Sequence, residues 1–185
     1  MRPIEHLKPL PNAPDGVEGL FKLHHDMIFR TAYRITASIV DAEDVLQTVF
    51  LRLVNRKGKL DLSPNLSPNP GAYLYRAAIN ASLDLLRGRG RLLSVPLENA
   101  GAKSVDQLNP EQQQARRELL ARVRQSVSEL GPRAAEIVVL KYFEGHDNGE
   151  IAGLLGTSQM VVAVTLHRAR ARLRKDVGKF LEEQL

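Results

Sequence analysis

Apolar residues recur at the spacing of an α-helix along almost the whole chain, and this periodicity restricts the fold more than any other feature. In the run from Tyr73 to Leu86, for example, Leu74, Ala78 and Ala81 fall on one helical face. No alternating apolar–polar stretch of useful length predicts a β-strand. The sequence therefore predicts an all-α fold.

Two segments interrupt the helical periodicity. Residues 55–71 are rich in Pro, Asn, Gly and Lys, and residues 92–109 combine Pro96 and Gly101 with small polar side chains. We interpret the second break as a flexible linker between two small helical domains. The predicted division is an N-terminal extension at 1–16, a first domain at 17–91, the linker at 92–110 and a second domain at 111–185.

The second domain contains the pattern of a helix-turn-helix. Asp147 and Glu150 form a predicted capping box, Gly156 suits a left-handed turn, and Thr157 or Ser158 can cap the last helix. In that helix the predicted core stripe is Val162, Leu166, Ala169 and Leu173.

A dense basic row follows in the same helix, made of Arg168, Arg170, Arg172, Arg174 and Lys175. From Ser158 to Lys175 the helix spans about 27 Å, long enough to cross a DNA groove. This arrangement predicts DNA binding. The alternative is a solvated helix end, where basic side chains are favoured by the helix dipole.

The composition excludes several other classes of protein. The chain has 185 residues, a net charge of +5 and no cysteine, so disulfides and thiolate metal sites are ruled out. His24 and His25 diverge by about 100° around a helix, and we interpret them as surface residues rather than metal ligands. No constellation of side chains indicates an enzyme, a metal site or a cofactor. No run reaches the roughly 18 apolar residues of a membrane span, and the N-terminus lacks a signal-peptide core, so we expect no membrane insertion and a cytoplasmic location.

Two polar patterns stand out in the first domain. Asp41 is a predicted N-cap, with Asp44 three residues later as in a capping box. Asn80 and Asp84 share one face of a helix in which both have poor propensity. They can contact base edges, or form a structural bond that holds the 55–71 segment.

Three ordered blocks resemble the extracytoplasmic-function (group four) sigma factors of RNA polymerase. The run Asp41–Leu53 resembles the family signature DAEDLxQxxFLRxW, and Tyr73–Arg87 resembles its helix WLYRIARNxAxDxLR. The second domain matches at Leu130–Arg133, Tyr142–Gly145, Glu150–Ala152 and Leu166–Arg170. The resemblance covers about Leu20 to Lys175.

The resemblance implies a specificity subunit rather than an enzyme. The first domain is then expected to bind the β-prime clamp of core RNA polymerase and to open the minus-ten promoter element. The second domain is expected to dock on the β flap and read the minus-thirty-five element. The linker is expected to thread through the polymerase, and an anti-sigma factor is an expected partner.

The resemblance also assigns candidate residues in the first domain. It assigns polymerase binding to Asp41, Glu43, Asp44, Gln47 and Phe50, although helix capping alone explains Asp41. Contact with minus-ten DNA falls to Arg76, Asn80, Asp84, Arg87, Arg89 and Arg91, with the arginines on phosphates.

In the second domain the candidate minus-thirty-five residues are Thr157, Ser158, Gln159, Thr165, His167, Arg168, Arg170 and Arg172. The chain departs from the family here, because Val161–Thr165 replaces a Thr-Val-Lys-Ser-Arg type of run. We therefore predict a readout based on thymine methyl groups, DNA shape and phosphates. Two alternatives remain for Met160, Val161, Ala163 and Val164: a protein interface, or burial in a wider core face.

Two other functions compete with the sigma factor. A free-standing helix-turn-helix regulator has no need of the Asp41–Leu53 block. A sigma-like decoy or partner-switch protein has no need of Asn80 and the arginine-rich helix.

Overall fold

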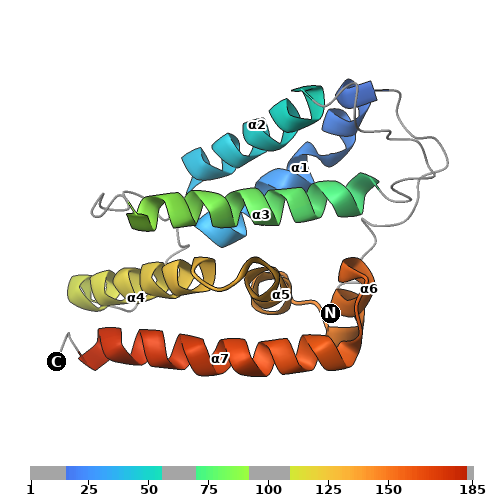
Figure 1. Cartoon of the computed structure of the whole chain (residues 1–185). Coiled ribbons are helices and arrows are strands. Elements are labelled where there is room, and N and C mark those ends of the chain that lie inside the picture. Colours follow the sequence, from blue (N-terminus) through green and yellow to red (C-terminus); the bar gives the residue numbers. More distant parts are fainter. Residues whose placement is uncertain (1–15, 56–69, 92–108, 183–185) are drawn as a thin grey trace.

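The computed structural model describes residues 16–55, 70–91 and 109–182, and the regular structure in these ranges is entirely α-helical. The all-α prediction is therefore confirmed. The N-terminal extension, most of the 55–71 break and most of the expected linker lie outside the described residues. The helices are α1 (Gly16–Thr36), α2 (Ile39–Asn55), α3 (Pro70–Arg91), α4 (Pro110–Ser128), α5 (Pro132–Tyr142), α6 (Asn148–Leu155) and α7 (Gln159–Glu182) (Figure 1).

Helices α1, α2 and α3 form the first domain. Only Ala37 and Ser38 separate α1 from α2, and Ala37 turns the chain by adopting a left-handed φ of 58°. Its N–H donates to the carbonyl of Tyr33 at 2.8 Å. The three helices enclose an apolar core that includes Ile28, Ala32, Val45, Val49, Leu53, Leu74 and Ala78.

Helices α4 to α7 form the second domain. Asn109 caps α4 in a complete capping box with Gln112, so Pro110 is already the first helical residue rather than the end of the linker. Pro132 starts α5 as expected. The predicted stripe on α7 is confirmed, since Val162, Leu166 and Ala169 are buried and Leu173 packs against the same core.

Helix α3 is the part of the first domain that packs against the second domain, between α1 and α2 on one side and α4 and α5 on the other (Figure 1). Leu74, Ala78 and Ala81 face α1 and α2, in agreement with the sequence prediction. A second stripe joins the core of the other domain, in contact with side chains such as Val127, Leu130, Ile137 and Leu140. We call this second stripe, together with Ile35 of α1, the interdomain face: Ile35, Tyr75, Ile79, Leu83 and Leu86.

The interdomain face makes one continuous apolar core across both domains, and we call this packing the closed arrangement. Ile79 and Leu83 are fully buried in it, and Ile35 is 1% exposed. Burial of such side chains is the main favourable contribution to packing. The two domains are therefore held together by the same force that folds each of them.

No single helix in the described ranges is both long and apolar enough to cross a membrane. Helices α6 and α7 reach that composition only as a pair, across a bend of 107°.

Candidate nucleic-acid and protein interfaces

The turn between α6 and α7 has the geometry that the sequence predicts. Asp147 Oδ1 accepts from the N–H of Glu150, and Glu150 Oε2 accepts from the N–H of Asp147, both at 2.8 Å. Gly156 ends α6 with a left-handed φ of 59°. Ser158 Oγ then accepts from the N–H of Val161 at 3.3 Å, which identifies Ser158 as the cap of α7. The result is a helix-turn-helix with α7 as its second helix.

Most of the surface of α7 is open. The candidate residues Ser158, Gln159, His167, Arg168, Arg170 and Arg172 are exposed, and Thr157 and Thr165 are half-buried. Within the described ranges, two of these arginines have an intramolecular partner. Arg170 Nε donates to the Tyr142 hydroxyl at 2.5 Å, and Arg172 Nε lies 3.9 Å from Asp176 Oδ2. The basic row thus lies at the open surface of α7, where a polyanion can reach it.

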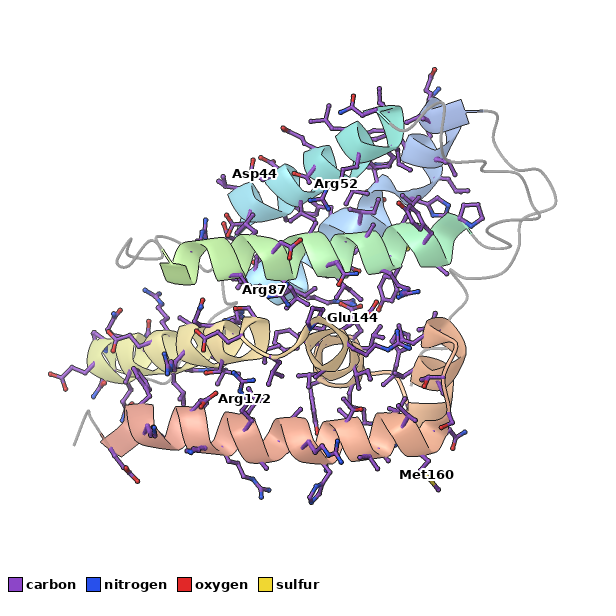
Figure 2. All side chains as sticks on the ribbon, in the orientation of Figure 1. Asp44, Arg52, Arg87, Glu144, Met160 and Arg172 are labelled. Atoms are coloured by element: carbon purple, nitrogen blue, oxygen red, sulfur yellow. The ribbon has the colours of Figure 1, made fainter. Side chains whose placement is uncertain are left out.

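The first turns of α7 present an exposed apolar patch made of Met160, Val161, Ala163 and Val164. Met160 is 77% exposed, Val161 49% and Val164 44%. Figure 2 shows Met160 directed away from the rest of the protein. The alternative in which a wider core face buries Val161 and Val164 is therefore wrong. Thymine methyl groups or a protein partner remain as candidate contacts.

On α2, three of the five candidate polymerase-binding residues share an exposed surface: Glu43, Asp44 and Gln47. Phe50 is instead 8% exposed and packs edge-on against Phe21, with ring centroids 4.8 Å apart. Phe50 therefore packs in the core of the first domain and does not share the exposed surface of the other three residues.

The capping prediction for Asp41 is wrong. Helix α2 begins at Ile39, and the N–H of Asp41 is itself a donor to Ser38 Oγ at 3.3 Å. The Asp41 side chain is 1% exposed and forms a two-pronged ion pair with Arg89 of α3, in which Nη1 donates to Oδ2 at 2.6 Å. A buried carboxylate needs such a partner. Asp41 therefore ties the start of α2 to the end of α3.

The candidate minus-ten residues on α3 are mostly engaged inside the protein. Arg76 Nε donates to Glu136 Oε1 of α5 at 2.8 Å. Arg87 Nη1 donates to Asp84 Oδ1 at 2.8 Å, and Arg87 Nε donates to the carbonyl of Ser128 in α4 at 2.6 Å. Figure 2 shows Arg87 on the side of α3 that faces the second domain. Asn80 is half-buried, and the side chain of Arg91 lies outside the described residues.

The sequence did not predict a second group of polar contacts across the interdomain face. Arg34 Nη1 donates to Glu144 Oε2 at 2.7 Å, and the Tyr75 hydroxyl lies 3.0 Å from His146 Nε2. Burial, and then the negative charge of Glu144, raise the pKa of Tyr75 well above its usual value. One available signal was Glu136, a lone carboxylate inside the apolar run Ala134–Leu140.

The sequence predicts that His24 and His25 of α1 are both surface residues, and this prediction is wrong for His24. His24 is only 9% exposed, and this burial lowers its pKa. His25 stacks on Phe21, with ring centroids 5.2 Å apart. Within the described ranges, His, Asp and Glu side chains do not gather into a group of three that could hold a metal ion.

Comparison with known proteins matches both domains separately. A family model for Sigma-70 region 2 matches residues 20–92, and one for Sigma-70, region 4 matches residues 120–173. The RNA polymerase sigma-E factor of Streptomyces avermitilis is 35% identical over 160 residues, which cover 86% of this chain and 84% of that protein. The ECF RNA polymerase sigma factor SigW of Bacillus subtilis is 26% identical over 171 residues, with coverages of 88% and 89%. Among solved structures, CnrH in complex with the cytosolic domain of CnrY covers 91% of this chain and 89% of that chain, at 24% identity and a TM-score of 0.47.

Proposed function

Because this chain belongs to the extracytoplasmic-function group of the sigma-70 family of RNA polymerase sigma factors, we propose that its two domains divide the recognition of a promoter between them. A sigma factor directs core polymerase to promoters, and the catalytic steps of RNA synthesis belong to the polymerase. We place the protein in the cytoplasm, where the polymerase works.

The observation that carries the proposal is the contrast between the two sides of α7. One side is buried at Val162, Leu166 and Ala169, and the other exposes a basic row that begins at Arg168. Such a helix can enter the major groove while its core stripe holds it on the domain. We assign Arg168, Arg170 and Arg172 to phosphates of the minus-thirty-five element. Ser158, Gln159, Thr165 and the apolar patch are assigned to base edges and thymine methyl groups.

The exposed acidic face of α2 is the proposed site for the polymerase clamp. Glu43, Asp44 and Gln47 point to solvent on one side of the helix, and Val45 and Val49 fix the other side in the core. Carboxylates on a rigid helix suit a basic partner surface. The second domain is proposed to dock on the β flap.

The minus-ten element is assigned to α3, through Arg76, Asn80, Asp84, Arg87, Arg89 and Arg91. In the closed arrangement Arg76 and Arg87 are bonded to the second domain. Release of these two arginines for DNA therefore requires the second domain to move away from α3.

One observation favours a second use of the second domain. The apolar patch at Met160, Val161 and Val164 is a candidate docking surface for an inhibitory anti-sigma factor. The solved complex of CnrH contains the cytosolic domain of CnrY, which makes a protein partner a reasonable proposal for this chain too.

Runoff transcription with purified core polymerase tests the assignment. The double variant E43K/D44K is expected to lose most core binding and transcript, because it inverts the charge of the proposed clamp face. The matched control is E18K/E182K, which makes the same change in net charge at exposed acids of α1 and α7. If the wild-type chain neither binds core polymerase nor starts transcripts on any promoter offered, the function is that of a decoy or partner-switch protein instead.

A further inference from the structure

Three features converge on the interdomain face: arginines of the first domain, nearly buried carboxylates of the second, and a continuous apolar core. The side chains of Glu136 and Glu144 are each only 5% exposed. Their partners Arg76 and Arg34 are 40% and 53% exposed. The acids are therefore inserted into the contact, while the arginines cover them from outside (Figure 2 shows Glu144 between the two domains).

The position of these acids calls for a reason beyond the stability of the second domain. Removal of a carboxylate from water is costly unless cationic partners surround it. Glu136 receives Arg76 from the other domain at 2.8 Å and Arg133 from its own helix at 3.6 Å. Glu144 pairs with Arg34, again an arginine of the other domain, at 2.7 Å. An arginine of the first domain thus pairs with each acid, and Glu136 has a second, longer pair within its own helix.

We propose that Glu136 acts as an intramolecular substitute for a promoter phosphate at Arg76, and that Glu144 strengthens the same contact through Arg34, so that the closed arrangement keeps the first domain from DNA until the chain opens. This inference rests on the proposed function of α3. Guanidinium groups bind carboxylates and phosphates in the same way, through charge-assisted hydrogen bonds. A carboxylate bonded to Arg76 Nε therefore competes with a phosphate for the same guanidinium group.

The contact that occupies the arginines also covers the neighbouring surface of α3. Arg87 is held by the carbonyl of Ser128, and Tyr75 lies against His146. A nucleic-acid strand cannot approach α3 from this side while α4 and α5 lie on it. The closed arrangement therefore competes with DNA by charge and by volume.

The contact is built in a way that permits release. Buried ion pairs contribute little net stability, because desolvation offsets much of their attraction. Among the described residues, Arg87 Nη2 is buried without a hydrogen-bond partner, which is a further cost of closing. The apolar side chains of the interdomain face favour closing, and these polar costs reduce the difference in free energy between closed and open chains.

The exposed surfaces of the closed chain identify core polymerase as the partner that opens it. Glu43, Asp44 and Gln47 on α2 stay exposed in the closed arrangement, whereas Arg76 is bonded to Glu136 of the second domain. Polymerase can therefore bind α2 first and draw the second domain toward its own flap site. A partner that binds the open state better shifts the equilibrium by its difference in affinity for the two states.

The first experiment removes the two charges. The chain has no cysteine, so Lys22→Cys on α1 and Gln114→Cys on α4, both at exposed positions, can carry a pair of dyes that report the distance between domains. In this background, E136Q/E144Q is expected to lower energy transfer and to raise the affinity of the isolated chain for a forked minus-ten DNA about tenfold, because affinity scales with the open fraction.

Two controls make this result specific. E18Q/E182Q produces the same change in net charge at exposed acids outside the contact, and it is expected to leave energy transfer unchanged and to raise affinity much less. Addition of R76A to E136Q/E144Q is expected to remove most of the gain in DNA affinity. If affinity for DNA rises equally in E136Q/E144Q and in E18Q/E182Q, the proposed role of these two acids is refuted.

The second experiment locks the closed arrangement reversibly. Arg34→Cys and Glu144→Cys can be joined by a short bis-maleimide that contains a reducible disulfide, since removal of the Arg34 side chain uncovers position 144. The joined chain is expected to lose at least about nine-tenths of runoff transcription with core polymerase and to recover it on reduction. The control is Glu18→Cys/Lys22→Cys, joined within α1, which is expected to keep its activity.

The outcomes separate this inference from the proposed function. A joined chain that starts transcripts as well as the reduced chain contradicts the inference and leaves the sigma function intact. A chain that starts no transcripts even when it is reduced refutes the proposed function, and the inference falls with it.

Discussion

Helices α3 and α7 both carry rows of arginines, yet the fold treats them differently. Helix α7 buries one stripe against its own domain and leaves its arginines at the surface. Helix α3 buries two stripes, one in each domain, and Arg76 and Arg87 are bonded to the second domain. A row of basic residues thus predicts affinity for an anion. On α3 part of that row is already bonded to a carboxylate and a carbonyl of the same chain, whereas on α7 the arginines stay at the surface.

The largest expected effect tests whether α3 belongs to both cores. Ile79→Ala should lower the free energy of unfolding by about 3 kcal/mol, because it leaves a cavity at a fully buried position between the domains. Ile28→Ala, at an equally buried site within the first domain only, is the matched control. Amide hydrogen exchange should accelerate in α5 for Ile79→Ala more than for Ile28→Ala. Equal exchange in α5 for the two variants would show that the interdomain face does not stabilise the second domain.

The next comparison concerns the two arginine rows in the isolated chain. Arg170→Ala should weaken binding to all DNA sequences alike and lower the slope of log affinity against log salt by about one. Arg76→Ala should change the DNA affinity of the isolated chain much less, because Glu136 holds this arginine. Fluorescence anisotropy over a series of salt concentrations measures both. A larger loss for Arg76→Ala than for Arg170→Ala would reverse the contrast between the helices.

Alkaline pH should weaken the closed arrangement through Tyr75. The closed chain raises the pKa of Tyr75 above its ordinary value of 10.0, so the neutral phenol is favoured when the domains are packed. The resulting stability is fully present below pH 10 and is lost as the pH rises toward the raised pKa. The dye pair should report opening in this range. Tyr75→Phe removes the ionisable hydroxyl, and its opening curve should lack this component.

The smallest expected effect concerns Gln159 in the first turn of α7, which is proposed to contact base edges. A Cβ atom on Gly149 would lie 2.9 Å from Gln159 Nε2 and 3.2 Å from Asp147 Oδ1, so Gly149→Ala displaces the Gln159 amide. The substitution also favours helix α6 by up to about 1 kcal/mol. A binding selection should show the same change in base preference for Gly149→Ala and for Gln159→Ala. Unchanged preference in both variants would remove Gln159 from the set of base-reading residues.

The parts of the fold that depend on local sequence were predictable. The capping box at Asp147, the left-handed Gly156 and the stripe on α7 each depend on residues that follow one another at intervals of about one turn along the chain. The assignment of Asp41 failed for the opposite reason. Its partner Arg89 lies 48 residues away, and Ser38 caps α2 instead. Local pattern cannot distinguish a cap from a buried ion pair.

The interdomain face was missed although its signal is present in the sequence. Tyr75, Ile79, Leu83 and Leu86 recur at intervals of four, four and three residues beside the stripe that includes Leu74 and Ala78. Two apolar stripes on one helix indicate two buried sides. The periodicity does not indicate which helices cover the second stripe. Helices α4 and α5, which cover it, follow in the sequence only after the segment at 92–108.

The apolar character of the interdomain face gives the closed arrangement a temperature dependence. Ile79, Leu83 and Leu86 leave an apolar environment when the chain opens, so opening increases the heat capacity. Hydrophobic attraction weakens on cooling. We therefore expect a larger fraction of open chains in the cold than at growth temperature, and so a supply of DNA-competent molecules that varies with temperature even at a constant amount of protein.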